Sequence, residues 1–415
     1  MKQKRQLLRH FAFIAISFVT ILSFQNCSQF RTLDLSKSVN SASSSPSDST
    51  SPSTPTQPPD YNSDVLKKMQ VNLGVKGNSN CQMQPPVIPD FDLASDGANV
   101  LKVCADSSKC PYQTINSALA SATSGSVIAV AAGTYEECIV VNKDNITFQG
   151  RAGRPYIHAT GCGAAPWIGA VFGIFANNTV IENFEISDNT GLSVIAVGIG
   201  KAGVNLTMNN LYIHDMISAL YTIGAGNVII TNNYVDHTGR QVGGDPHTDA
   251  GISIGMGTSS FSMKNTVIAH PRQNGGMLST VAYKSVVDCL VAADLDGGLS
   301  TYMVSFGWGF DSTLTNSVVQ RGPLTLTQQL VLYWERDTPM PQDQFTAKNN
   351  ILISDRPMRD RPIIDYGSNG PTTYANNIFV GPNSSSYSNF PGSQSFESRA
   401  AAGIPDDQLP YPGSR

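Results

Sequence analysis

Short runs of alternating apolar and polar residues recur between about residue 96 and residue 385, and each run crosses a polar position that is nearly always asparagine. The residues one and three places further on are mostly apolar, so one face of each run is predicted to point inward as a β-strand. The positions that align these runs are Asn183, Asn210, Asn233, Asn265, Asp288, Asn316, Asn350 and Asn377.

The spacing between these aligned positions varies from 23 to 34 residues. A solenoid absorbs such variation as surface loops without disturbing its stacked strands. Asparagine suits a corner of each coil because it tolerates left-handed backbone, and stacked amides can hydrogen-bond along the axis. The pattern therefore predicts an all-β fold, a single solenoid of about ten coils at about 27 residues each.

The asparagine-marked runs resemble the pectin-lyase-like superfamily of right-handed parallel β-helices, in which such an asparagine lies between the second and third strand of a coil. The opening segment carries the same resemblance, since residues 114–125 look like a short helix and residues 126–150 like strand, turn at Gly133, strand and strand. We expect this N-terminal helix to cap the first coil and cover its strand edges. The resemblance implies this fold, which is shared by polysaccharide lyases, hydrolases and binding proteins.

The N-terminus reads as an export signal. A basic start precedes a short apolar run, residues 11–24, which is short for a membrane span and ends just before Cys27. This resembles a bacterial lipoprotein signal, with residues 1–26 removed and Cys27 lipidated; an uncleaved anchor or an ordinary signal cut nearby is the alternative. Ser28 resembles the residue of lipoproteins sorted to the outer membrane, although either face of that membrane could carry the protein.

Composition divides the remaining chain. Residues 27–80 are predicted to be a disordered tether, because Ser, Thr and Pro dominate residues 35–62 and apolar residues nearly vanish in that stretch. Residues 81–385 are predicted to form the β-helix and residues 386–415 a C-terminal tail. Charged residues make up only 14% and the net charge is −4, which gives no electrostatic footprint for nucleic acid. We expect a monomer that touches the membrane only through its lipid.

An exported chain can form disulfides. The sequence suggests two local pairs, Cys104 with Cys110 and Cys138 with Cys162. Cys289 falls at a predicted interior position and is interpreted as a small buried hydrophobe. No CxxC pair supports a zinc site.

Candidate chemistry gathers just past the third strand of successive predicted coils. Equivalent positions there lie about 4.8 Å apart, so His214, His237 and His270 are expected to be neighbours, accompanied by Asp215 and Asp236. The candidate catalytic residues are His237, Asp245, His247, Asp249 and His270, with Arg272 as a charge clamp. The candidate substrate-binding residues are His214, Asp294, Asp296, Tyr302 and Trp334.

Three interpretations of these residues compete. In a hydrolase, two carboxylates among Asp245, Asp249, Asp294 and Asp296 would act as acid and base. In a lyase, a base such as Lys, Arg or His would remove the proton beside a uronate while a cation neutralises the sugar carboxylate. No lysine falls in the strip, so Arg240, Arg272 or a neutral His247 would have to serve. In the third interpretation they are loop residues that hydrogen-bond their own turns. The Asn-Thr-Asp, Asp-Asp and Gly-His-Gly series of polygalacturonase-like hydrolases is absent from the sequence.

The sequence thus predicts a cell-envelope lipoprotein that recognises, and in one hypothesis cleaves, a polysaccharide. The alternative is a non-catalytic surface module that binds glycan or protein. Aromatic side chains on the outer faces of strands could stack on sugar rings in either case. His247 and Asp249 could hold a divalent ion such as Ca²⁺, but their spacing matches no defined ligand motif.

Overall fold

The computed structural model divides the chain into two compact units, Met1–Thr54 and Pro55–Arg415. All the residues that the structure describes belong to the second unit: 71–72, 81, 89–91, 97–106, 109–158, 162, 169–188, 195–239, 250–271, 276–294, 303–307, 311–321, 330–334, 344–354, 363–366, 372–382, 384, 390–404 and 410–411. Cys27 and nearly all of the predicted tether lie outside them. No helix in this described part of the chain has the length and apolarity to span a bilayer.

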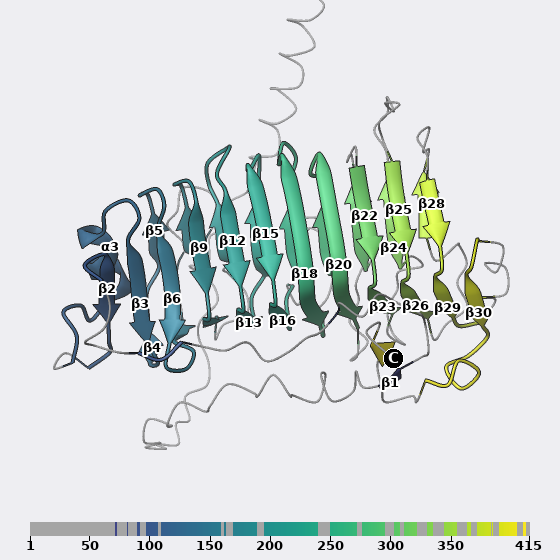
Figure 1. Cartoon of the computed structure of the whole chain (residues 1–415), viewed down its shortest axis with the longest axis horizontal. Coiled ribbons are helices and arrows are strands. Elements are labelled where there is room, and N and C mark those ends of the chain that lie inside the picture. Colours follow the sequence, from purple (N-terminus) through teal and green to yellow (C-terminus); the bar gives the residue numbers. More distant parts are fainter. Residues whose placement is uncertain are drawn as a thin grey trace, which may run out of the picture. The chain divides into compact units, whose positions relative to one another are not determined.

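The second unit is built from parallel strands that form three rows, with successive coils contributing one strand to each row (Figure 1). The first row is a nine-stranded sheet. Its strands are β5 (Ile139–Val141), β8 (Ala170–Ile174), β11 (Ile195–Ile199), β14 (Ser218–Thr222), β17 (Ile252–Ile254), β19 (Leu278–Thr280), β21 (Val304–Gly307), β24 (Val331–Trp334) and β27 (Ile363–Tyr366).

The second and third rows together make the larger, 20-stranded sheet. The second row holds β2 (Val100–Val103), β3 (Val127–Ala131), β6 (Thr147–Arg151), β9 (Thr179–Glu182), β12 (Leu206–Asn209), β15 (Asn227–Thr231), β22 (Asp311–Thr315), β25 (Gln344–Lys348) and β28 (Thr372–Ala375). The third row holds β4 (Thr134–Tyr135), β7 (Tyr156–His158), β10 (Glu185–Ser187), β13 (Tyr212–His214), β16 (Tyr234–Asp236), β23 (Val318–Arg321), β26 (Ile351–Ser354), β29 (Ile378–Val380) and β30 (Gln394–Phe396). Two long strands, β18 (Ser260–Ala269) and β20 (Lys284–Ala293), run through both rows.

This pairing confirms the predicted fold, a right-handed parallel β-helix, the hand being the one that parallel crossovers take. Strand β30 pairs with β29, so strand stacking continues beyond residue 385. A short parallel pair joins β1 (Val71–Asn72) to β31 (Pro410–Tyr411).

The one helix of the described residues, α3 (Ile115–Ser121), packs against β2, β3 and β5 at the N-terminal end of the stack (Figure 1). Thr114 caps it by accepting a hydrogen bond from the backbone N–H of Ser117 at 3.1 Å. The Glu137 carboxylate accepts from the backbone N–H of Ile115 at 2.7 Å, which satisfies a second unpaired donor of the first turn. The helix buries Ile115, Ala118 and Leu119, so it covers the apolar end of the coil as predicted.

From the coil of β9 onward, the corner between the second and third rows uses one left-handed residue per coil, with φ from 49° to 64°. These residues are Asn183, Asn210, Asn232, Asn265, Cys289, Asn316, Asn349 and Asn376. Their amides hydrogen-bond between coils: Nδ2 of Asn210 donates to Oδ1 of Asn183 at 2.6 Å, and Nδ2 of Asn349 donates to Oδ1 of Asn316 at 3.2 Å. The predicted asparagine ladder is therefore confirmed.

The sequence alignment was wrong by one residue in four of these coils. The corner residues are Asn232, Cys289, Asn349 and Asn376 instead of the aligned Asn233, Asp288, Asn350 and Asn377. In the pairs Asn232–Asn233, Asn349–Asn350 and Asn376–Asn377 the first asparagine forms the corner and the second is buried, Asn350 and Asn377 fully so. Nδ2 of Asn350 donates to the Leu314 carbonyl at 2.8 Å, and its backbone N–H donates to Oδ1 of Asn377 at 3.0 Å. A second, interior ladder thus runs beside the corner.

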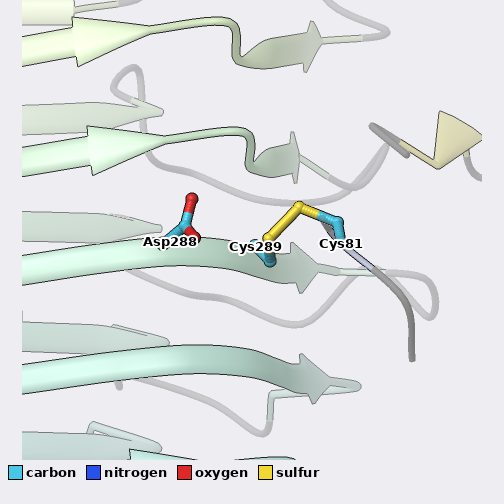
Figure 2. Close-up of side chains that lie close together, drawn as sticks. All are labelled: Cys81, Asp288 and Cys289. Carbon is cyan, nitrogen blue, oxygen red and sulfur yellow. A yellow bond between two sulfur atoms is a disulfide. The ribbon is translucent and has the colours of Figure 1, made fainter. Parts of the chain in front are cut away.

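Cys289 is the one corner residue of these coils that is not asparagine, and it forms a disulfide with Cys81, with the Cα atoms 5.4 Å apart (Figure 2). Its interpretation as a simple buried hydrophobe is wrong: the residue is buried, but its sulfur joins the chain across a sequence separation of 208 residues. The pairs Cys104–Cys110 and Cys138–Cys162 are confirmed.

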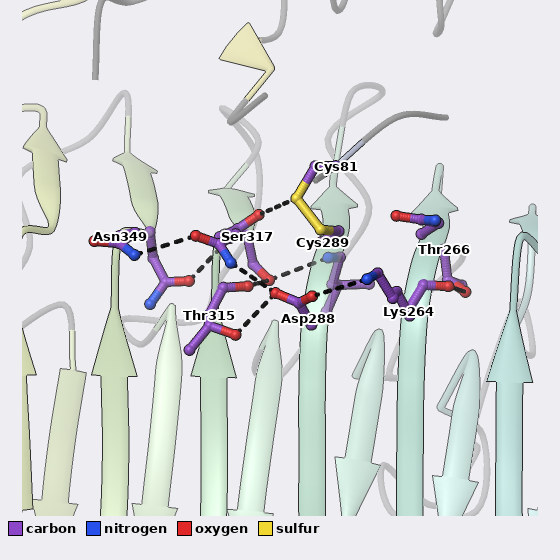
Figure 3. The surroundings of a disulfide bond; sticks show 12 residues. Cys81, Lys264, Thr266, Asp288, Cys289, Thr315, Ser317 and Asn349 are labelled. Atoms are coloured by element: carbon purple, nitrogen blue, oxygen red, sulfur yellow. Dashed lines mark hydrogen bonds and ion pairs between the residues drawn. A yellow bond between two sulfur atoms is a disulfide. The ribbon is translucent and has the colours of Figure 1, made fainter. Parts of the chain in front are cut away.

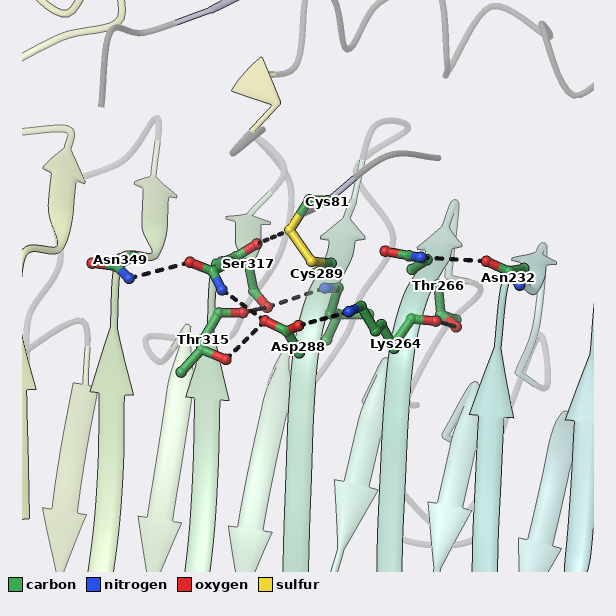
Figure 4. Close-up of polar contacts among 12 residues, drawn as sticks. Cys81, Asn232, Lys264, Thr266, Asp288, Cys289, Thr315, Ser317 and Asn349 are labelled. Carbon is green, nitrogen blue, oxygen red and sulfur yellow. Dashed lines mark hydrogen bonds and ion pairs between the residues drawn. A yellow bond between two sulfur atoms is a disulfide. The ribbon is translucent and has the colours of Figure 1, made fainter. Parts of the chain in front are cut away.

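Polar residues around this disulfide compensate for the missing asparagine (Figure 3). Nδ2 of Asn316 donates to Oδ1 of Asp288 at 2.8 Å, and the hydroxyl of Thr315 donates to the same oxygen at 2.9 Å. The other carboxylate oxygen of Asp288 lies 3.7 Å from Nζ of Lys264. On the opposite side, Asn265 donates to Asn232 (Figure 4), but its buried Oδ1 has no hydrogen-bond partner among the described residues. With a cysteine at position 289, the ladder therefore lacks the hydrogen bond that Oδ1 of Asn265 would accept. Asp288 accepts the hydrogen bond that Asn316 donates on the other side.

Candidate functional site

The outer face of the third row changes character along the helix axis. From β18 onward its side chains form an apolar cluster separate from the main core, which Phe396, Ala402 and Ile404 of the C-terminal segment cover. The earlier strands β7, β10, β13 and β16 instead present Tyr156, Glu185, Tyr212 and Tyr234 in one register position. We call the polar part of this face, with the corner residues that follow it, the polar strip: Tyr156, Glu185, Tyr212, His214, Asp215, Tyr234, Asp236, His237 and His270.

Asp236, His237 and His270 form the first group of the polar strip, which we call the Asp236 cluster. Oδ1 of Asp236 lies 2.7 Å from Nδ1 of His270 and 3.0 Å from Nδ1 of His237. The two imidazoles come from successive coils and stack with their centroids 5.0 Å apart and their planes at 19°. Both histidines have left-handed backbone, with φ of 45° and 46°. One carboxylate oxygen therefore fixes the orientation of both rings.

Burial and hydrogen bonding oppose each other at Asp236. Burial raises the pKa of its carboxyl group, but the hydrogen bonds and charges of His237 and His270 lower it more, and the net result is a pKa of about 2. The carboxylate is therefore ionised at neutral pH. A carboxylate that holds an imidazole in this way can orient it to take a proton from water or from a sugar hydroxyl.

Glu185, His214 and Asp215 form the second group. Nδ1 of His214 lies 2.8 Å from Oδ2 of Asp215, and Nε2 lies 3.2 Å from Oε1 of Glu185. Burial lowers the pKa of His214, but its hydrogen bonds to Asp215 and Glu185, together with their charges, raise it to about 9. His214 is therefore an imidazolium at neutral pH, held between two carboxylates.

Tyrosine rings accompany both groups. The ring of Tyr212 stacks on His214 with centroids 4.4 Å apart, and on Tyr234 with centroids 5.4 Å apart. The hydroxyl of Tyr156 lies 2.7 Å from Oγ of Ser187. Tyr156 and Tyr234 are half-buried, whereas Tyr212 is buried. Stacking on the aromatic face of Tyr212 also favours the cationic form of the His214 imidazole.

The structure brings some of the predicted site residues together. His237 and His270 occupy equivalent positions on successive coils, as predicted. His214 does not share their position, because it pairs with Asp236, and Asp215 takes the equivalent corner. Asp294 follows β20 one coil after His270 and is fully buried. Glu185 and Tyr212 were not among the candidates; only the register across coils places them beside His214.

The remaining candidates cannot be placed in this site. Asp245, His247, Asp249, Arg272, Asp296 and Tyr302 lie outside the described residues. Trp334 lies in β24, where its backbone pairs with Gly307 in β21 and Tyr366 in β27. The described part of the site is therefore the polar strip alone.

No family model matches the chain, and no curated protein matches it. Solved structures that resemble it include the pectin methylesterase from Aspergillus niger, with 15% sequence identity and a TM-score of 0.37 over 76% of this chain and 90% of that chain. Pectin methylesterase PemA from Erwinia chrysanthemi has 15% identity and a TM-score of 0.38 over 73% and 94%. The GH136 lacto-N-biosidase from Eubacterium ramulus has 11% identity and a TM-score of 0.42 over 72% and 66%. Likenesses of this size assign neither an activity nor a catalytic residue to this chain.

Proposed function

We propose that this protein is an exported lipoprotein of the cell envelope that binds a polysaccharide along its polar strip. The observation that carries the proposal is the alignment, on neighbouring coils, of tyrosine side chains with hydrogen-bonding carboxylates and imidazoles. Sugar rings need both kinds of group, because one face of a pyranose is apolar and its rim carries hydroxyls.

The charge of the polar strip favours one class of glycan. Glu185, Asp215 and Asp236 contribute three carboxylates, whereas His214 is the imidazolium whose pKa lies well above neutral. An anionic polysaccharide would meet this excess of negative charge at close range, which disfavours its binding. We therefore infer that the ligand is neutral or carries amino groups.

Cleavage of the bound glycan is a second candidate function, favoured by the geometry of the Asp236 cluster. Asp236 is ionised, and it orients the imidazoles of His237 and His270, so either ring could accept a proton from an attacking water. The two-carboxylate hydrolase mechanism has less support, since Asp294 is fully buried and the other predicted carboxylates are outside the described residues.

Export has independent support from the disulfides. Three of them join the described cysteines, and structural disulfides form in oxidising compartments outside the cytosol.

Attachment through Cys27 stays a prediction of the signal sequence. Replacing Cys27 with Ala should move the protein from the detergent phase to the aqueous phase and abolish incorporation of labelled palmitate. Unchanged partitioning would contradict lipidation at this residue.

Glycan binding can be tested with an array of neutral, amino-bearing and anionic polysaccharides and the purified protein. Replacement of Tyr234 by Ala should weaken binding of the preferred glycan about tenfold, which corresponds to about 1.4 kcal/mol. Tyr283→Ala is the matched control, because Tyr283 is an exposed tyrosine outside the polar strip. If no polysaccharide binds, or if both variants lose affinity equally, the proposal is wrong.

Cleavage is tested in the same incubations by following reducing ends. Asp236→Asn and His270→Gln should each reduce turnover at least about a hundredfold if the imidazole acts as a base. Binding without any release of reducing ends would leave recognition standing and exclude hydrolysis.

A further inference from the structure

We propose that Asp236, His237 and His270 form a binding site for a transition-metal dication such as Zn²⁺. The inference goes beyond the proposed function and does not rest on it. It starts from the convergence of one carboxylate and two imidazoles, each of which offers a ligand atom within 4.8 Å of the other two.

The donor set matches the chemistry of such ions. Two imidazole nitrogens and one carboxylate oxygen are ligands that Zn²⁺ and its neighbours accept, with bonds of about 2.0–2.2 Å. Two ligand atoms at that distance from one ion lie about 3.4 Å apart at the tetrahedral angle that Zn²⁺ prefers. The Oδ1–Nδ1 distances in the Asp236 cluster are 2.7 and 3.0 Å, those of the direct contacts between Asp236 and the two imidazoles, so a separation of about 0.4–0.7 Å would admit the ion. Ca²⁺ fits poorly, because it takes six to eight oxygen ligands.

The fold itself brings these atoms together. Asp236 ends β16, which pairs with β18 so that Asp236 lies opposite Ala269. The next residue on each coil, His237 and His270, adopts left-handed backbone. The two rings stack on each other, and each presents its Nδ1 to Oδ1 of Asp236. The convergence is therefore set by backbone pairing between two coils, and burial of Asp236 limits the freedom of its carboxylate.

The neighbouring group of Glu185, His214 and Asp215 lacks the convergence of ligand atoms that binding of one ion requires. His214 also contacts two carboxylates, but through different ring nitrogens: Nδ1 faces Asp215 and Nε2 faces Glu185. These two nitrogens are on opposite edges of one imidazole, so the two carboxylates cannot reach a common ion together with the ring. In the Asp236 cluster, by contrast, Nδ1 of His237 and Nδ1 of His270 both face Oδ1 of Asp236.

Another group of potential ligands, Cys81, Asp288 and Cys289, is excluded on chemical grounds (Figure 2). Metal binding by cysteine requires the thiolate, and both sulfurs are joined in the disulfide. Asp288 then offers a single carboxylate beside Lys264 and Thr315. Within the described part of the chain, the Asp236 cluster is the group whose three side chains are all able to coordinate an ion.

Titration of the purified protein, without a histidine tag, with ZnCl₂ in a calorimeter tests the proposal. We expect one equivalent of Zn²⁺ to bind, and His237→Gln, His270→Gln and Asp236→Asn each to weaken binding at least about tenfold. His214→Gln is the matched control, since it removes a neighbouring histidine that does not converge with the cluster, and it should leave the affinity unchanged. No Zn²⁺ binding, or equal losses in all four variants, would overturn the proposal.

X-ray absorption of Zn²⁺ in the unsubstituted protein gives a readout that does not depend on how well the variants fold. The expected spectrum contains scattering from two imidazoles and from light atoms at about 2.0–2.1 Å, without sulfur. Sulfur at about 2.3 Å would place the ion at cysteines, and one imidazole or none would place it elsewhere; either result contradicts the assignment.

Discussion

Loss of the Cys81–Cys289 disulfide is expected to destabilise the β-helix more than loss of either local disulfide. The bond spans 208 residues, whereas Cys138–Cys162 spans 24 and Cys104–Cys110 spans 6. In the chain-entropy model a bridge restricts the unfolded chain more as its loop grows. The model predicts losses of about 5 kcal/mol for the longest loop, about 3 kcal/mol for the intermediate one and about 2 kcal/mol for the shortest.

The choice of residue at position 289 adds a second, independent comparison. With Cys81 replaced by Ser, Cys289→Asn would put an amide back into the left-handed corner, where asparagine is tolerated. That amide would lie between Asn316 and the buried Oδ1 of Asn265, which has no hydrogen-bond partner among the described residues. Cys289→Ala offers neither advantage. The asparagine variant should therefore retain about 2 kcal/mol more stability than the alanine variant, about half from the backbone and half from the hydrogen bond.

Guanidinium-induced unfolding of the purified, oxidised proteins measures these differences. Circular dichroism and tyrosine fluorescence must report the same transition before a free energy is derived. The reasoning on loop length is refuted if the Cys81→Ser/Cys289→Ala protein is no less stable than a protein lacking the Cys104–Cys110 bond. The ladder argument is refuted if asparagine and alanine at position 289 give equal stability.

Three further predictions concern single side chains. The pKa of His214 is raised from 6.5 to about 9, so its ion pairs stabilise the fold fully below about pH 6.5 and are lost as the pH rises through about 9. An NMR titration of the His214 ring should have its midpoint near pH 9. His214→Gln should remove this alkaline loss of stability. The pKa of Asp236 is lowered from 3.8 to about 2, so its contribution is present above pH 3.8 and lost as the pH falls through about 2; Asp236→Asn should flatten this part of the pH dependence of the urea midpoint. Asn350→Ala removes the hydrogen bonds that Nδ2 donates to the Leu314 carbonyl and to Oδ1 of Asn377 and should cost about 2–3 kcal/mol in chemical denaturation, whereas a loss below about 0.5 kcal/mol would contradict the interior ladder.

The fold could be predicted because two simple patterns agree. Inward apolar residues repeat with a period of two, and asparagine marks a corner where few other residues are stable. The local disulfides were also predictable, since residues a few positions apart remain close in most conformations of the chain. The bond from Cys81 to Cys289 was not, because its partners are close only after the coils have stacked.

The register of the coils was harder to predict than their existence. In the pair Asn232–Asn233 either residue can adopt left-handed backbone, and the apolar Tyr234 that follows made Asn233 the better match. The structure places Asn233 inside, where its Oδ1 accepts a hydrogen bond from the backbone N–H of Leu211 at 2.8 Å. A buried asparagine satisfied by neighbouring coils leaves no local signal in the sequence.

The same one-residue error affected the candidate site. It placed His214 level with His237, although the strand pairing puts His214 opposite Asp236. The carboxylate that organises the two later histidines was therefore recognised only as polar company and not as the centre of the group. Glu185 was missed because its contact with His214 spans 29 residues of sequence and depends on the stacking of β10 on β13.

The covalent link between Cys81 and Cys289 also determines how a mechanical load would travel through the protein. A pull on the N-terminal segment first loads the two-residue pairing of β1 with β31, and beyond it enters the β-helix at Cys289, in the middle of the stack, and not at the end covered by α3. Residues 82–288 then lie within the closed loop and outside the loaded path between the N-terminus and the C-terminus. The coils that carry the Asp236 cluster would thus keep their pairing under tension that could peel apart the coils following Cys289.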